Sequence, residues 1–105
     1  MILVMGKVLV EPEDLGAFVS LAREVTRHTR LEPGCLHYAF AADLAEPNCL
    51  WLTESWADLE SLAAHGQTAH IAVFRRENAK LRVRSFSAKR YVGTDETVLV
   101  ARGEG

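Results

Sequence analysis

Residues 35–56 read CLHYAFAADLAEPNCLWLTESW, which is two runs of apolar and aromatic residues on either side of a polar segment. The polar segment, Asp43–Asn48, is rich in residues that favour turns and contains a proline. It therefore predicts a β-hairpin with strands Cys35–Ala42 and Cys49–Trp56. In this hairpin the two cysteines lie at opposite ends of the ladder, too far apart for a disulfide.

A strand and a helix are predicted before the hairpin. Ile2–Val10 is dense in Val, Leu and Ile, which is typical of a buried strand. Pro12, followed by two acidic residues, indicates a helix start, because proline fits the first turn and carboxylates favour the positive end of the helix dipole. Glu32-Pro33-Gly34 predicts where this helix ends, since the residue before a proline is disfavoured in the α conformation.

A second helical region and a fourth strand are predicted after the hairpin. Either Ser55 or Asp58 is placed to cap the helix that follows. Gly66 is expected to break it, and Thr68 to cap a further helical piece that runs to about Ala79. Alternating residues then predict a strand at 84–92, and 97–101 is a short run with β propensity that could add an edge strand to this sheet or to that of another protomer.

The predicted order β-α-β-β-α-β is that of the ferredoxin-like α+β fold, an antiparallel sheet with its helices on one face. We expect one domain over residues 1–105. The third strand carries apolar side chains on both faces, with Leu50 and Leu52 alternating with Trp51. Because the sheet face without helices would then expose apolar surface, we expect a homodimer through that open face.

Composition excludes several other classes of protein. The 105 residues are 49% hydrophobic and 25% charged, which is typical of a globular domain. A net charge of −2 argues against a nucleic-acid partner. No apolar stretch reaches the roughly 18 residues that a membrane span needs, and no signal peptide is evident, so we expect no membrane partner and a cytoplasmic location.

Side chains that could take part in catalysis or binding concentrate between the third strand and the helices that follow it. The ordered series Pro33-Gly34-Cys35-Leu36-His37-Tyr38, then Asp43 and Pro47, then Glu54-Ser55-Trp56, then Leu62-Ala63-Ala64-His65 and Gln67-Thr68-Ala69-His70 resembles the antibiotic biosynthesis monooxygenase (ABM) family. The resemblance covers nearly the whole chain. It implies a dimeric α+β barrel and a monooxygenase that oxidises a phenolic, quinol or polycyclic aromatic molecule with O₂.

The resemblance implies that no metal, flavin or other cofactor takes part. A deprotonated phenol or quinol is electron-rich enough to reduce O₂ itself, so the protein must supply a proton acceptor and an enclosed aromatic cavity. We expect catalytic roles for His70, Trp56 and His65. We expect substrate-binding roles for Tyr38, Glu54 and Phe74.

Each of these residues also has a purely structural interpretation. Trp56 at a strand end is as often part of the core, and His65 near a helix C-terminus is favoured there by the dipole. On one continuous helix, two histidines five residues apart would diverge by about 140°, so only a break at Gly66 can bring His65 and His70 to one site. The same spacing disfavours a zinc pair, which prefers i, i+4.

Two other functions remain open at this point. One is a non-catalytic small-ligand-binding dimer of the same fold, in which these side chains fill the core. The other is haem degradation. It is less favoured because the relatives with that activity carry an asparagine on the first strand, and residues 1–10 contain none.

Overall fold

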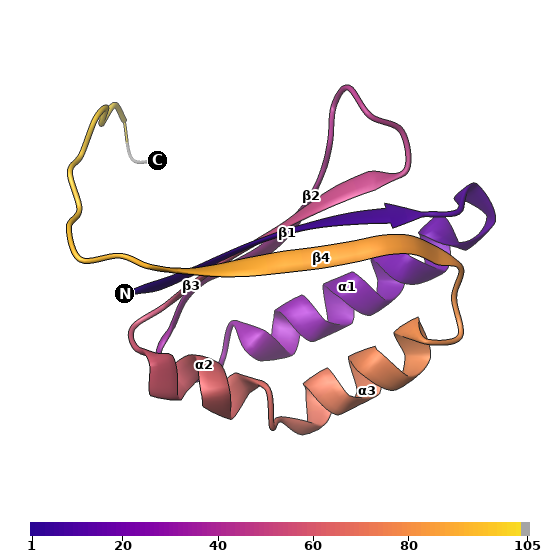
Figure 1. Cartoon of the computed structure of the whole chain (residues 1–105), viewed down its shortest axis with the longest axis horizontal. Helices are drawn as coiled ribbons and strands as arrows, with labels where there is room; N and C mark the ends of the chain where they lie inside the picture. Colours follow the sequence, from indigo (N-terminus) through magenta and orange to yellow (C-terminus); the bar gives the residue numbers. More distant parts are fainter. Residues whose placement is uncertain (104–105) are drawn as a thin grey trace.

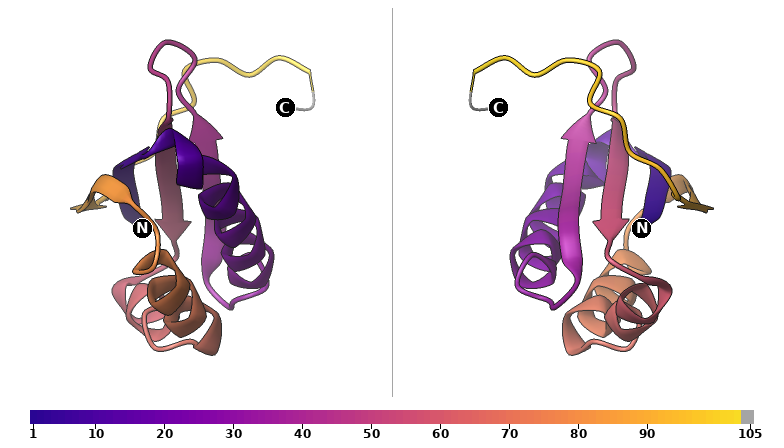
Figure 2. Two further views of the ribbon diagram at one scale, coloured as in Figure 1. Left: turned by 90° about the vertical axis from the view of Figure 1, so that its right-hand side faces the viewer. Right: turned by 90° about the vertical axis from the view of Figure 1, so that its left-hand side faces the viewer.

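The computed structural model describes residues 1–103 and shows a four-stranded antiparallel sheet with the helices on one of its faces (Figures 1 and 2). The strands lie in the order β2-β3-β1-β4. This is the predicted ferredoxin-like α+β fold. Along the chain the elements are β1 (Ile2–Val10), a 3₁₀ turn (Pro12–Asp14), α1 (Leu15–Thr29), β2 (Cys35–Ala42), β3 (Cys49–Trp56), α2 (Leu59–His65), α3 (Ala69–Asn78) and β4 (Val83–Val92).

The hairpin of β2 and β3 has the predicted limits, and Asp43 fixes its turn. The Asp43 carboxylate accepts hydrogen bonds from the backbone N–H groups of Ala45 and Glu46 and from the indole N–H of Trp51, each at 2.8 Å. The Trp51 bond is the largest of several that lower the pKa of the Asp43 carboxyl. Both cysteines are free thiols, as the positions in the ladder predict.

The helix ends follow local hydrogen bonding. Pro12 begins a single 3₁₀ turn, so α1 itself starts only at Leu15. Asp58, rather than Ser55, caps α2 by accepting a hydrogen bond from the backbone N–H of Ser61. Thr68 caps α3 as predicted, so the helical region is interrupted between residues 65 and 69. None of the helices in residues 1–103 is long and apolar enough to cross a membrane.

The core lies between the sheet and the helices. Alternate residues of β1 and β3 face the helices, and Val8 and Trp56 have no exposed surface. Phe18 of α1, equally buried, packs edge-on against Phe40 and Phe74. Trp56 lies at the end of β3 and Phe18 in the first turn of α1, so the core extends along the sheet and holds the helical layer against it.

The opposite face of the sheet has no helix over it. Leu3, Met5 and Tyr91 on this face are 40%, 51% and 49% exposed. Trp51 lies half-buried beside them, with the Lys7 ammonium 5.4 Å from its ring centre. This apolar open face agrees with the sequence analysis; the dimer expected from it stays a prediction.

Gly34, in the connection from α1 to β2, should tolerate no side chain. Its φ of +81° disfavours other residues, and a Cβ there would overlap the side chain of Ser61. We expect Gly34→Ala to lower the free energy of unfolding by about 2–4 kcal/mol, because backbone strain and overlap add. Urea unfolding at a fixed protein concentration measures this.

Gly16→Ala in α1 is the matched control, because a Cβ at Gly16 meets no atom within 4 Å. Alanine in a helix should raise the free energy of unfolding by about 0.5–1 kcal/mol. Equal unfolding midpoints for Gly34→Ala and the unmodified chain would show that this connection is not fixed as described.

Candidate functional site

A cavity of about 540 Å³ lies between the sheet and the α2–α3 region. All four strands and both helices contribute to its wall, and most of the wall is apolar or aromatic. The apolar residues include Phe40, Phe74 and Phe86. The polar and charged members of the wall are Tyr38, Glu54, His65, Arg75, Asn78, Lys89 and Arg90.

Glu54 places a carboxyl group in the apolar wall of this cavity. It is buried on β3, and its Oε1 accepts a hydrogen bond of 2.8 Å from the indole N–H of Trp56, two residues further along the same strand face. Burial raises the pKa of the Glu54 carboxyl, and the Trp56 hydrogen bond offsets only part of that rise. The protonated form of Glu54 is therefore more favoured in the cavity than it would be in water.

A second carboxylate, Glu32, joins the two candidate histidines. Its Oε2 atom lies 2.6 Å from Nδ1 of His65 and 2.7 Å from Nε2 of His70. An ionised carboxylate can only accept hydrogen bonds, so each of these ring nitrogens donates. In the neutral rings, the unprotonated nitrogens are then Nε2 of His65 and Nδ1 of His70.

His65 is the histidine that faces the main cavity. Its ring lies between Trp56 and Tyr38, with centroid separations of 4.8 and 5.5 Å, and is almost fully buried. Burial and the nearby carboxylates raise the pKa of Tyr38, so its hydroxyl remains a hydrogen-bond donor. Glu32, His65 and the cavity thus form the carboxylate–imidazole arrangement of a general base.

His70 lies on the other side of Glu32. Its ring stacks on His28 at 5.5 Å, and it lines a separate cavity of about 210 Å³ with residues of α1 and α3. The interruption after Gly66 brings both histidines to one carboxylate, as the sequence analysis required. The two rings nevertheless open onto different cavities, because they approach Glu32 from α2 and α3.

The structure brings four of the six predicted site residues into the main cavity wall: Tyr38, Glu54, His65 and Phe74. Trp56 lies behind the wall, with its N–H already bonded to Glu54, and His70 lies behind Glu32.

Glu32 is a residue that the sequence reasoning missed. It precedes His65 by 33 positions and was explained there as part of a helix stop, so no spacing pattern linked the two. Asn78 was not singled out as a site residue either. It lines the main cavity, and its buried Oδ1 has no hydrogen-bond partner among the described residues. Such an oxygen is available to a hydroxyl donor on a ligand.

Two groups of side chains have the spacing of metal ligands. The ligand atoms of Glu32, His65 and His70 all lie within 4.8 Å of one another, and so do those of a second group, Asp43, Glu46 and Cys49. In the first group the shared oxygen already accepts two hydrogen bonds, and in the second Asp43 already holds the hairpin turn. Both groups therefore have structural partners without an ion.

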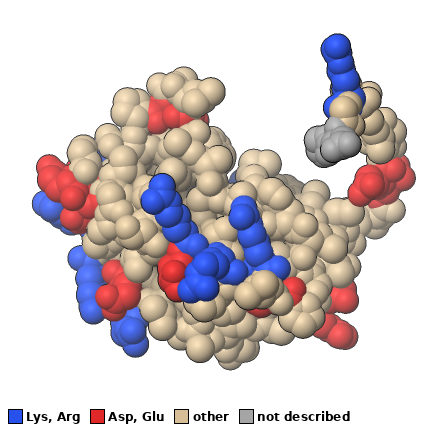
Figure 3. All heavy atoms as spheres, turned by 180° about the vertical axis from the view of Figure 1, so that it is seen from behind, with Lys and Arg blue, Asp and Glu red and all other residues tan. Residues whose placement is uncertain are grey.

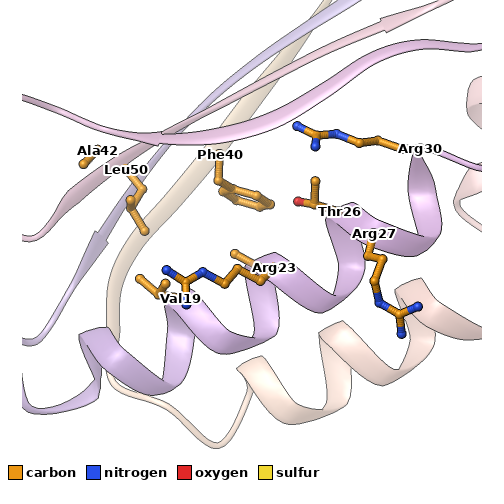
Figure 4. Close-up of a pocket in the computed structure, with 9 residues that line it drawn as sticks. Val19, Arg23, Thr26, Arg27, Arg30, Phe40, Ala42 and Leu50 are labelled. Atoms are coloured by element: carbon orange, nitrogen blue, oxygen red, sulfur yellow. The ribbon is translucent and has the colours of Figure 1, made fainter.

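A larger cavity of about 610 Å³, here called the α1–β2 groove, lies on the other side of Phe40, which contributes to both cavities. Figure 3 shows the back of the molecule, where blue Lys and Arg side chains gather near the centre. Figure 4 shows the groove itself, with arginines of α1 and Arg30 around an apolar floor. Its wall contains no histidine or carboxylate, so it lacks the acid–base groups of the main cavity.

Comparisons with known proteins find relatives of this chain in sequence and in fold. A protein of Synechocystis, the uncharacterized protein sll1783, is 30% identical over 90 residues, which are 86% of this chain and 61% of that protein. The chain thus spans about three fifths of the length of this curated relative.

Among solved structures, a Deinococcus radiodurans protein assigned provisionally as an antibiotic biosynthesis monooxygenase superposes with a TM-score of 0.91. It is 22% identical, and the match covers 96% of this chain and 100% of that one. Rv0793 from Mycobacterium tuberculosis has a TM-score of 0.83 at 23% identity, covering 92% of this chain and 98% of that one. At these identities the likeness establishes the fold.

The family model described as antibiotic biosynthesis monooxygenase (ABM) matches residues 1–77, a range that contains Glu32, Glu54, Trp56 and both histidines. The chain belongs to the antibiotic biosynthesis monooxygenase family.

Proposed function

We propose that this protein is a monooxygenase that oxidises a quinol or related phenolic aromatic molecule in the main cavity, with His65 as the general base and without a metal or flavin. The observation that carries the proposal is the Glu32–His65 hydrogen bond of 2.6 Å at the wall of a cavity lined by three phenylalanine rings. Family membership supports the reaction class, and the substrate class rests on the cavity.

The chemistry needs only a base and an oriented substrate. Nε2 of His65 takes the proton of a quinol hydroxyl, while Glu32 holds the ring and stabilises the imidazolium that forms. The resulting anion transfers electrons to O₂. For 1,4-dihydroxynaphthalene the balanced reaction gives 2-hydroxy-1,4-naphthoquinone and water, so the quinol supplies all four electrons and one oxygen atom enters the product.

The remaining polar groups of the cavity are suited to hold such a substrate. A cavity of about 540 Å³ lies within the range of roughly 300–1,000 Å³ that is usual for small-molecule sites. Phe74 and Phe86 present aromatic surface to a fused ring. The Tyr38 hydroxyl can donate a hydrogen bond to its oxygens, and the Glu54 carboxyl, whose pKa is raised by burial, can do so in its protonated form. Trp56 acts by positioning Glu54.

A homodimer through the open sheet face completes the proposal. Packing two such faces together would bury Leu3, Met5 and Tyr91, which are otherwise exposed to solvent. The helices would then lie outside, with the cavity of each protomer still bounded by its own α2 and α3.

We also propose that the protein acts in the cytoplasm.

A non-catalytic ligand-binding dimer is the second candidate. It is favoured by the burial of Trp56, which has no exposed surface and whose N–H is satisfied within the protein. In that case the cavity binds an aromatic molecule but does not transfer its proton. Turnover separates the two candidates.

His65→Gln should lower kcat/KM for 1,4-dihydroxynaphthalene by about 10²–10⁴-fold, because the base is lost. Oxygen uptake and quinone absorbance, measured in chelator-treated protein with the enzyme-free oxidation rate subtracted, report this. Glu32→Gln should reduce kcat more than it changes KM, because it disturbs the orientation of the base.

His70→Gln is the matched comparison, since His70 bonds to the same carboxylate oxygen but faces a different cavity. We expect a much smaller loss than with His65→Gln. Equal rates for all three variants and the unmodified protein would exclude the proposed base. Tight binding of the quinol without turnover would favour the second candidate.

The raised pKa of Glu54 predicts a specific pH dependence of stability. The folded protein keeps this proton above the usual carboxyl value of 4.5, whereas the unfolded chain releases it there. The stability contributed by protonated Glu54 is therefore full below pH 4.5 and is lost as pH rises through the raised pKa.

Glu54→Gln keeps the shape of the neutral acid and does not titrate. The melting temperature of Glu54→Gln minus that of the unmodified protein should therefore increase from pH 4 to pH 8. Calorimetric scans of both proteins across this range measure the difference, in which the titration of all other groups largely cancels. A difference that is constant with pH would contradict a raised pKa at Glu54.

A further inference from the structure

Three side chains that converge near the end of α1 are of the types that bind transition metals. Glu32 lies in the connection after α1, His65 at the end of α2 and His70 in the first turn of α3. Figure 1 shows these three parts of the chain next to one another. Each side chain presents one ligand atom, and these atoms all lie within 4.8 Å of one another. Two imidazoles and one carboxylate are the ligands of several zinc and non-haem iron sites.

The separations between these atoms are close to those of a coordination sphere. Oε2 of Glu32 lies 2.6 Å from Nδ1 of His65 and 2.7 Å from Nε2 of His70. In a tetrahedral site with metal–ligand bonds of about 2.0–2.2 Å, neighbouring ligand atoms are about 3.3–3.6 Å apart. Side-chain rotations that move each ligand atom by less than about 1 Å therefore admit an ion in place of the two hydrogen bonds.

The surroundings hold both rings in the orientation that ligation needs. The ring of His65 is packed between Trp56 and Tyr38, and the ring of His70 is stacked on His28. Because the rings are fixed by these contacts, the nitrogens that face Glu32 keep their direction when the hydrogen bonds are replaced. Such fixed ligands cost little ordering when an ion binds.

An ion reaches this group from the side of His70. The side chains of His65 and Glu32 are 7% and 10% exposed, whereas that of His70 is 19% exposed. His70 also lines the cavity of about 210 Å³ between α1 and α3, which gives a route to solvent. Three protein ligands leave a fourth tetrahedral position for a water molecule.

The ligand types select a transition metal ion. Mg²⁺ and Ca²⁺ take six or more oxygen ligands, and this group supplies one carboxylate. Cu⁺ prefers thiolate and thioether ligands, which the group lacks. Imidazole with carboxylate suits Zn²⁺ and Co²⁺, and Glu32 supplies one negative charge toward the two positive charges of such an ion.

We propose that Glu32, His65 and His70 bind a divalent transition metal ion such as Zn²⁺, and that the bound ion blocks the base. Coordination uses the lone pairs of Nδ1 of His65 and Nε2 of His70. Through exchange with water, the proton of each neutral ring moves to its other nitrogen, so no proton is gained or lost. Nε2 of His65 then carries a proton and accepts none from a quinol. The block rests on the reaction proposed above, whereas the metal site does not.

Titration of the chelator-treated, full-length protein with Co²⁺ tests the site without turnover. We expect one equivalent of Co²⁺ per chain, with a visible absorption band that Zn²⁺ removes and a large excess of Mg²⁺ does not. Glu32→Gln and His70→Gln should each weaken binding at least about 100-fold, because each removes a ligand. His70 is the most exposed of the three ligands, so its variant serves if Glu32→Gln does not fold.

His37→Gln is the matched control, because His37 lies on β2, is exposed and bonds to Thr53. It should bind Co²⁺ as the unmodified protein does. Binding that is lost in Glu46→Gln would place the ion at the group of Asp43, Glu46 and Cys49 instead. That result, binding that none of the variants changes, or no binding at all would overturn the proposal.

Turnover in the presence of the ion tests the block. Zn²⁺ at ten times its dissociation constant should lower quinol-dependent oxygen uptake at least about tenfold in the unmodified protein. The same concentration should change the rate of His70→Gln little, because that variant keeps the base and lacks a ligand. Uptake that persists or rises with Zn²⁺ bound would overturn the block. Metal binding by a protein without turnover would overturn the catalytic proposal and the block, and would leave the metal site standing.

Discussion

One carboxylate oxygen holds the site together. Oε2 of Glu32 accepts hydrogen bonds from His65 at the end of α2 and from His70 in the first turn of α3. Glu32 lies in the connection between α1 and β2, so a single atom ties three separate parts of the fold to each other. It also fixes which nitrogen of each ring carries the proton, and thereby leaves Nε2 of His65 basic. The break between α2 and α3 serves this contact, since no continuous helix could present both rings.

The two carboxyl groups of the site, half-buried Glu32 and buried Glu54, are held in different environments. Glu32 has two imidazole donors, whereas Glu54 has one indole donor and an apolar cavity, and burial raises its pKa. Environments that differ in this way separate the roles of similar groups. In the proposed reaction Glu32 orients the base, whereas the raised pKa of the Glu54 carboxyl suits it to a different role in the cavity wall. Trp56 connects them physically, because its ring packs on His65 while its N–H holds Glu54.

The sequence predicts the elements well because their signals are local. Alternating apolar residues define Cys35–Ala42 and Cys49–Trp56, and Thr68 caps α3 where predicted. The site is less predictable, because it depends on contacts between distant segments. Nothing near Glu32 shows that its side chain reaches residues 33 and 38 positions away. The sequence places both histidines at helix ends, whereas the cavity that each ring faces is set by tertiary packing.

The ionisation state of a bound quinol tests the role of His65 as a base most directly. Anaerobic titration of the protein with 1,4-dihydroxynaphthalene at pH 7, followed by ultraviolet–visible absorbance, distinguishes the neutral quinol from its anion without turnover. We expect the spectrum of the anion in the unmodified protein, at a pH far below the phenolic pKa of about 10, and the spectrum of the neutral quinol in His65→Gln. A neutral bound quinol in both proteins would contradict His65 as the base.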